Sequence, residues 1–407
     1  MHCPGPVSYI GSFPYPIIAR LSQIDENYSR YPEFRASAFA NFDWAFTVRE
    51  MKPQHSLSAV VLVIIAATTL RGQDAYTNPL GYVRLQTLPT SDTIVACPLE
   101  RQPEFSGKVA SITANVVAVD GNPTWTGGQF QFTEGSQPKI YHARFTSGAL
   151  AGSYFTVLGN SNNSLTLDLN GTTLDQAVAG DGLTLTAYWS IGALFPATDA
   201  GVSFEISPSV FARRTEVLVP DQAAVGINHS AIAIYFFYAG AWRKIGAPIT
   251  TSFNNTAALL PDSWIIVRNR GFSGSLCFLG SVLKSAVRID LNSTAGAKQD
   301  NIVALTRPID VTLDASGLIA SGAFRSSTNA TTRTDELFVF DNTASGINKS
   351  AAATYFYYGG GWRKVGQSLT TNFGTDPVFK AGQGVVVRKG ANGIASLTNP
   401  WVNIANY

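Results

Sequence analysis

The sequence has few charged residues and no dominant sign of charge. Asp, Glu, Lys and Arg make up 14% of the 407 residues, and the formal net charge is only +2. An average soluble domain carries about 25% charged residues. Surfaces that bind nucleic acids need clustered Lys and Arg, but the basic residues here form no run longer than a pair. These pairs are Arg213-Arg214, Arg243-Lys244, Arg363-Lys364 and Arg388-Lys389. We therefore expect no nucleic-acid partner.

The chain is also poor in residues that bind metals or activate nucleophiles. It has four His and three Cys, and it contains no C-x-x-C, H-E-x-x-H or H-x-H motif. A Ser-His-Asp triad would need His142 or His229 as its base, and no G-x-S-x-G motif accompanies either. We predict no cofactor, no metal site and no catalytic residue. A pair of carboxylates acting as a glycosidase stays open, because any two acids can converge in a fold.

Long apolar runs are nearly absent, and the one exception predicts export. Met51-Lys52 begins a short basic stretch, Ala59 to Ala67 is unbroken apolar sequence, and small and polar residues follow. This three-part pattern is typical of a secretory signal peptide, here residues 51–75. The run is shorter than the roughly 20 apolar residues of a transmembrane helix. We expect a secreted or extracellular protein, in the periplasm or on the outer surface, with no transmembrane span in the mature chain.

The position of this segment leaves two interpretations of residues 1–50. In the first, translation starts at Met51 and residues 1–50 are an upstream extension that is not part of the mature protein. In the second, residues 1–50 are a cytoplasmic tail before a signal anchor. Residues 1–50 show neither helical nor strand periodicity, which favours the first.

Helical periodicity is missing after residue 76. Short apolar or alternating runs recur instead, among them GYVRL (81–85), DTIVACPL (92–99), KIYHARF (139–145) and LTLTAYW (183–189). Gly, Asn, Asp and Pro separate them, and Asp120-Gly121 and Asn170-Gly171 are favourable hairpin turns. Such spacing is typical of sandwich-like or barrel-like folds. We therefore predict an all-β protein.

One sequence unit occurs twice. Residues 213–268 align without a gap onto residues 333–388 at an offset of 120, and 24 of the 56 pairs are identical. A weaker similarity between 81–99 and 286–307 extends the two copies. We predict two tandem β-sandwich or barrel-like repeats. The first spans 76–271 with a small inserted β domain at about 121–200, the second spans 286–391, and 392–407 form a C-terminal tail.

The repeated unit contains an aromatic hairpin. Four consecutive aromatic residues precede a Gly turn, and Trp-Arg-Lys begins the return strand. Side chains alternate between the two faces of a strand, so aromatic rings should lie on both faces. These residues either form the core of each copy or make an exposed platform that stacks on sugars. The candidate ligand-binding residues are Tyr235, Tyr238, Trp242, Arg243, Tyr355, Tyr358, Trp362 and Arg363.

Two cysteines remain after the predicted signal peptide. An exported protein can join Cys97 and Cys277 in a disulfide. Each cysteine also lies in an apolar run, where a buried free thiol is the alternative. The sequence does not choose between them.

Several motifs together resemble a known family. These are P-x-GYVRL followed by S-D-T-x-V in Pro79 to Val95, D-N-x-V-A-L-T-R-P in Asp300 to Pro308, and G-I-N-x-S…W-R-K in Gly346 to Lys364. The chain resembles an uncharacterised family of secreted bacterial β-rich repeat proteins with no established activity. The resemblance implies export and β architecture and carries over no catalytic residue. Some relatives end in a hydrophobic sorting segment, which the ending NPWVNIANY lacks.

Three functions remain open on these observations. The first is an exported, non-enzymatic structural or adhesive protein of the bacterial cell envelope or extracellular matrix. The second is a secreted carbohydrate-binding protein that uses the aromatic hairpins. The third is an extracellular polysaccharide hydrolase. A cell-surface glycan or self-assembly would supply the partner.

Overall fold

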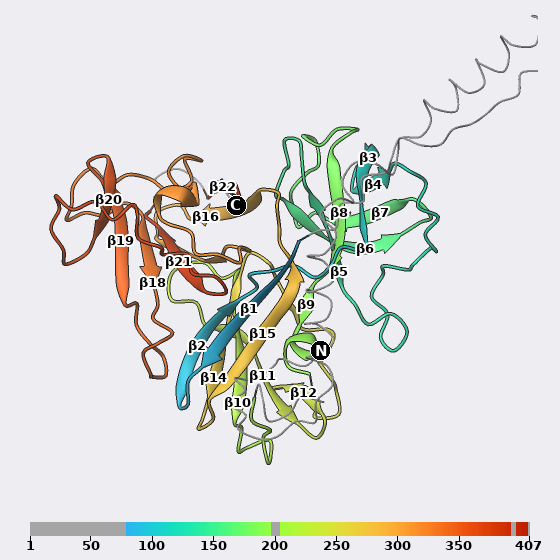
Figure 1. The fold of residues 1–407 in the computed structure, drawn as a ribbon, viewed down its shortest axis with the longest axis horizontal. Coiled ribbons are helices and arrows are strands. Elements are labelled where there is room, and N and C mark those ends of the chain that lie inside the picture. Colours follow the sequence, from blue (N-terminus) through green and yellow to red (C-terminus); the bar gives the residue numbers. More distant parts are fainter. Residues whose placement is uncertain (1–78, 197–203, 392–395, 406–407) are drawn as a thin grey trace, which may run out of the picture. The chain divides into compact units, whose positions relative to one another are not determined.

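The structure, a computed structural model, describes residues 79–196, 204–391 and 396–405. The predicted extension (1–50) and signal peptide (51–75) lie outside these residues. The described chain is almost entirely β-structure (Figure 1), which confirms the predicted fold class. Within the described residues, no helix is long and apolar enough to cross a membrane.

A five-stranded antiparallel sheet and a two-stranded ribbon form what we call the first unit. The sheet has the order β12-β11-β10-β14-β2, and the ribbon is β1-β15. A core that includes Val217, Trp242 and Phe278 lies between sheet and ribbon. The strands are β1 (Leu80–Thr87), β2 (Ser91–Ala96), β10 (Thr215–Pro220), β11 (Ala231–Tyr238), β12 (Ala241–Lys244), β14 (Trp264–Asn269) and β15 (Gly274–Ser281).

The second unit has the same plan. Its sheet has the order β17-β21-β18-β19-β20, and its ribbon is β16-β22. The core of this unit includes Leu337, Trp362 and Trp401. The strands are β16 (Val287–Ser293), β17 (Gln299–Ala304), β18 (Glu336–Val339), β19 (Ala353–Tyr358), β20 (Gly361–Lys364), β21 (Gly384–Lys389) and β22 (Leu397–Asn403), and a short 3-10 helix, η2 (Asp314–Ser316), lies between β17 and β18.

The registers of the two sheets agree at the sequence offset of 120. Glu216 pairs with Arg268 between β10 and β14, and Glu336 pairs with Arg388 between β18 and β21. Both ribbons extend beyond the predicted unit boundaries. β15 lies after residue 271, and β22 lies in the predicted tail, where it pairs with β16 along its whole length. The apolar run around Cys277 is part of β15, but neither its pairing with β1 nor the strand β22 was predicted, because the partner strands lie far away in the sequence.

A closed six-stranded barrel is inserted between β2 and β10. Its strand order is β3-β4-β7-β6-β5-β8 around a core that includes Phe145, Leu165 and Leu185. It begins at Phe105 and ends at Ala187, so it starts and ends earlier than the predicted insertion of about 121–200. The elements are β3 (Phe105–Thr113), β4 (Val116–Val119), β5 (Tyr141–Phe145), β6 (Tyr154–Asn160), β7 (Ser164–Asp168) and β8 (Gly182–Ala187), followed by β9 (Trp189–Ser190), which pairs with β13 (Ala258–Leu259), and α3 (Ile191–Leu194).

The two units contact each other through reciprocal interactions. The backbone N–H of Asp92 donates to the carbonyl of Gly346, and that of Asp300 donates to the carbonyl of Gly226, at 2.9 and 2.8 Å. Each aspartate also accepts a hydrogen bond from the Asn of the opposite Gly-Ile-Asn turn. The donors are the backbone N–H groups of Asn348 (to Asp92) and Asn228 (to Asp300), at 2.7 and 2.8 Å.

The Gly-Ile-Asn turns adopt the backbone conformation that their residues favour. Gly226 and Asn228 have φ of 105° and 58°, and Gly346 and Asn348 have φ of 142° and 55°. Glycine and asparagine tolerate positive φ better than other residues. Each turn therefore presents its backbone donors to the other unit.

Candidate functional site

The aromatic hairpins contribute mainly to the two cores. Trp242 and Trp362 are 0% and 1% exposed, and Tyr235 and Tyr355 are 8% and 5% exposed. The Trp242 indole N–H donates to the carbonyl of Phe195 at 3.1 Å. These four side chains are therefore not available to an external ligand, and the core interpretation holds for them.

The other four candidate hairpin residues are half-buried. These are Tyr238, Arg243, Tyr358 and Arg363. Arg243 donates from Nε to the carbonyl of Tyr238 at 3.2 Å, and Arg363 donates to the carbonyl of Thr371 at 2.8 Å. Both guanidinium groups thus bond to backbone near their own hairpin. The structure does not bring the eight predicted residues together as one exposed platform.

The cysteine pair does not form. Cys97 is a free, buried cysteine inside the core of the first unit. Leu276 and Phe278 of β15 point into that same core, so Cys277 between them points to the other face of the strand, where the Tyr82 hydroxyl lies 3.4 Å from its Sγ. Of the two alternatives that the sequence left open, the structure has the buried free thiol at Cys97, and Cys97 and Cys277 do not form a disulfide.

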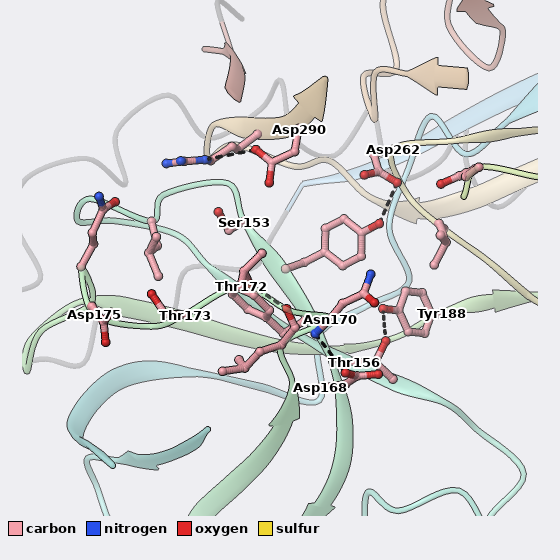
Figure 2. A pocket seen from close by; sticks show the side chains of 18 residues that line it. Ser153, Thr156, Asp168, Asn170, Thr172, Thr173, Asp175, Tyr188, Asp262 and Asp290 are labelled. Atoms are coloured by element: carbon pink, nitrogen blue, oxygen red, sulfur yellow. Dashed lines mark hydrogen bonds and ion pairs between the residues drawn. The ribbon is translucent and has the colours of Figure 1, made fainter. Parts of the chain in front are cut away.

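A cavity lies where the barrel meets both units. Its volume is about 670 Å³, and it opens to solvent. Figure 2 shows that its lining is dominated by carboxylate, amide and hydroxyl groups. The barrel supplies most of the lining, the turn before β14 supplies Asp262, and β16 supplies Arg288 and Asp290. The remaining lining residues are Leu150, Ser153, Tyr154, Phe155, Thr156, Asp168, Leu169, Asn170, Thr172, Thr173, Asp175, Gln176, Tyr188, Gln222 and Leu260.

Asp262 is the most distinctive group in this cavity. Its Oδ1 accepts a 2.7 Å hydrogen bond from the Tyr154 hydroxyl (Figure 2), and its backbone carbonyl accepts one from Ala304 of the second unit. Burial raises the pKa of Asp262, and the nearby charge of Asp290 acts in the same direction, while the Tyr154 hydrogen bond and Arg144 oppose the shift. Burial also raises the pKa of Tyr154, so Tyr154 remains a hydrogen-bond donor.

A buried ionic cluster lies behind Tyr154. Arg144 is 1% exposed, and its Nε donates a 2.8 Å hydrogen bond to Oε1 of Glu100. Its guanidinium carbon lies over the Tyr154 ring, 5.2 Å from the ring centroid. Burial alone would raise the pKa of Glu100, but Arg144 and His142 together lower it to about 2. Burial lowers the pKa of His142, against the opposing effect of Glu100. Removing such charges from water costs several kcal/mol per ion, so this cluster holds Tyr154 at a considerable energetic cost.

The other walls carry fixed polar groups. The hydroxyls of Tyr188 and Thr156 are hydrogen-bonded at 2.9 Å. Asp168 accepts a hydrogen bond from the Asn170 backbone N–H at 3.0 Å, as expected for an aspartate that forms a turn. On β16, Nε of Arg288 lies 3.9 Å from Oδ1 of Asp290. No group of three or more His, Cys, Asp or Glu side chains in the described ranges could hold a metal ion.

In the second unit, an apolar side chain covers the position that corresponds to Asp262. Residue 382 corresponds to Asp262 at the offset of 120, and it is glycine. A Cβ built on Gly382 would lie 2.8 Å from Cδ1 of Leu85, so an apolar side chain lies directly against this turn. The turn at Gly382 thus packs against Leu85, whereas the equivalent turn at Asp262 borders the polar cavity beside the barrel.

Sequence reasoning missed Tyr154, Asp262 and Asp290, because they come from three segments far apart in the chain. No motif marks them, and the repeat alignment does not help, because positions 254–266 share no identical residue with positions 374–386. No protein-family model, no curated protein and no solved structure matches this chain.

Proposed function

We propose that this protein is an exported adhesive protein of the bacterial cell envelope or extracellular matrix, and that the cavity between barrel and units binds a glycan. The signal-peptide pattern and the resemblance to secreted β-rich proteins support export. The equal strand orders and registers support the inference that the two units arose by duplication.

The lining of the cavity suits a polyhydroxylated ligand. Asp168 and Asp175 offer carboxylate acceptors, and Thr172, Thr173 and Gln176 offer donors and acceptors. The apolar side chains in the lining, among them Phe155 and Leu260, can contact the C–H faces of a sugar ring. Ligand sites commonly combine a few placed polar groups with apolar surface in this way.

One observation carries the proposal. The first unit has an aspartate facing an open polar cavity, whereas the corresponding glycine of the second unit is covered by Leu85. Packing alone would be served by the closed arrangement on both sides. On the open side, the buried Arg144–Glu100 pair also lies behind Tyr154 in the cavity wall.

A glycan array probed with the full chain tests the proposal. We expect binding that falls at least tenfold in Asp175→Ala, since Asp175 is an exposed lining residue. Asp310→Ala is the matched control, because Asp310 pairs with Lys380 in the second unit, away from the cavity lining. Loss of binding in Tyr238→Ala and Tyr358→Ala, with Asp175→Ala unaffected, would favour the hairpins instead. If no glycan binds, the proposal fails.

Export has its own test. N-terminal sequencing of the natural product should place the mature start between about residues 67 and 76. A peptide from residues 1–50 in the natural product would contradict a start at Met51.

A further inference from the structure

Two carboxyl groups of unlike environment face the same cavity. Asp262 is withdrawn into the wall and accepts a hydrogen bond from Tyr154, whereas the Asp290 side chain is 47% exposed and lies beside Arg288. They come from different units, Asp262 from the turn before β14 and Asp290 from β16. Figure 2 shows both in the upper part of the view, whereas Asp168, Thr156 and Tyr188 lie together in the lower part.

We propose that this carboxyl pair hydrolyses a glycosidic bond of the glycan bound in the cavity, with Asp262 as the proton donor and Asp290 as the base. The inference rests on the proposed glycan binding and extends it from binding to cleavage. Many glycosidases place two carboxyl groups in one site, one as the proton donor and the other as the base or nucleophile.

The surroundings of each group suit its role. The groups that act on Asp262 are Tyr154 of β6, Arg144 of β5 and Asp290 of β16, and the dominant effect is burial, which favours the neutral carboxyl group. The Asp290 side chain is 47% exposed, so water can reach it, and its Oδ1 lies 3.9 Å from Nε of Arg288. Tyr154 fixes the orientation of Asp262, and the Arg144–Glu100 pair behind it fixes Tyr154. Tyr154 is thus a positioning residue.

The reaction balances with water as the only co-reactant. The Asp262 carboxyl O–H donates its proton to the glycosidic oxygen while the bond from that oxygen to the anomeric carbon breaks, and the bonding electron pair stays on the leaving oxygen. Asp290 removes a proton from a water molecule, whose oxygen forms the new bond to the anomeric carbon. Asp290 then releases its proton to solvent, and Asp262 takes one up. The products are two sugars with free hydroxyls.

The closed counterpart at Gly382 is a second observation that points to a ligand on the open side. There the residue that corresponds to Asp262 is glycine, and the Leu85 side chain packs directly against it. Within the described residues, both aspartates border the cavity beside the barrel, whereas the turn at Gly382 packs against Leu85.

The test uses the full chain and the array oligosaccharide that binds most tightly, labelled at its reducing end with a fluorophore. Product formation is followed by chromatography. We expect Asp262→Asn to lower turnover at least 100-fold while binding changes less than threefold, because the asparagine Oδ1 still accepts the Tyr154 hydrogen bond. Asp290→Asn should do the same. Asp310→Asn, a surface aspartate outside the cavity, should leave turnover unchanged.

The pH profile separates a proton donor from a structural residue. Turnover should fall on the basic side as Asp262 ionises. Tyr154→Phe removes a hydrogen bond that lowers the pKa of Asp262, so the basic limb should move to higher pH while the acidic limb stays in place. A basic limb unchanged in Tyr154→Phe would overturn the assignment of Asp262 as the acid.

The two proposals fail separately. Binding of the labelled oligosaccharide without any turnover by the wild-type chain overturns hydrolysis and leaves the glycan-binding function intact. Turnover that survives in Asp262→Asn and Asp290→Asn also overturns the proposal, and it assigns the cleavage to other groups. Absence of binding to every glycan on the array overturns both.

Discussion

The contact between Trp264 and Gly384 gives the sharpest test of how the two units fit together. These residues occupy equivalent positions at the offset of 120, one in each unit. The Trp264 indole N–H donates to the carbonyl of Val385 at 2.9 Å, and Trp264 belongs to the cluster of apolar residues between the two sheets. A Cβ built on Gly384 would lie only 1.8 Å from Cδ1 of Trp264.

We expect Gly384→Ala to lower the free energy of unfolding by about 2–4 kcal/mol. Gly384 has no positive φ, so the backbone tolerates alanine and the cost comes from space alone. The indole must move, which gives an overpacking cost of about 1–3 kcal/mol and the loss of one buried hydrogen bond, about 1 kcal/mol. Urea unfolding followed by tryptophan fluorescence measures the change as a lower midpoint with an unchanged slope.

A double-mutant cycle then isolates the contact. Trp264→Ala alone should cost about 3–5 kcal/mol as a large-to-small core change, and Gly384→Ala should add less than about 0.5 kcal/mol in that background. Additive costs would refute the reasoning, because alanine at 384 would then act through something other than the indole. Gly271→Ala is the matched control. Gly271 has neither a positive φ nor a heavy atom within 4 Å of a built Cβ, so its substitution should be nearly neutral.

Three further outcomes follow from the buried groups. Burial raises the pKa of Cys97, so iodoacetamide should label this thiol only after the chain unfolds. Labelling is followed by mass spectrometry. Rapid labelling of the folded chain would contradict the position of Cys97 in the core. Glu100→Gln should cost about 3–5 kcal/mol in urea unfolding, since it leaves Arg144 buried without its carboxylate. The pKa of Glu100 is lowered to about 2 in the folded chain. Its ionised carboxylate therefore contributes fully to stability above the ordinary pKa of about 4.5, and this contribution is lost as the pH falls towards 2. The free energy of unfolding should therefore fall less steeply with decreasing pH in the Gln variant than in the wild type. Asp92→Ala should lower the free energy of unfolding by about 3 kcal/mol. Asp92 is 4% exposed and accepts hydrogen bonds from the Arg268 guanidinium and from a backbone N–H of the other unit. A loss below about 1 kcal/mol in the same assay would show that the reciprocal contact contributes little.

Local patterns in the sequence were sufficient to predict the fold class and the hairpins. Alternation and turn residues act within a few positions, so β11 and β12 and the positive-φ turns at Asn228 and Asn348 could be predicted from short segments. The gap-free alignment also contained the common register of the two sheets. The ribbons could not be predicted, since β1 pairs with β15 across nearly two hundred residues and no local signal specifies that partner.

The candidate site was harder to predict than the fold. The aromatic hairpins fitted two interpretations, because aromatic residues both form cores and bind sugars. The burial of Trp242 and Trp362, which the sequence alone does not reveal, assigns these two residues to the cores. The cavity residues Tyr154, Asp262 and Asp290 carry no motif, and their proximity is a property of the tertiary structure. The alignment pairs Asp262 with Gly382, but this stretch of the repeat has no identical positions, and the φ of 76° at Gly382 favours glycine there on backbone grounds.

The insertion of the barrel into the first unit has a consequence for the order in which the chain can assemble. The barrel strands follow one another from Phe105 to Ala187, whereas β2 precedes them and finds its partner β14 only at Trp264–Asn269. During synthesis, the barrel strands are therefore complete before β14 is made. β2 can pair with β14, and so complete the first sheet, only after that point. Since contacts between distant residues form slowly, the barrel is expected to serve as the folded end against which β2 and β14 are brought together.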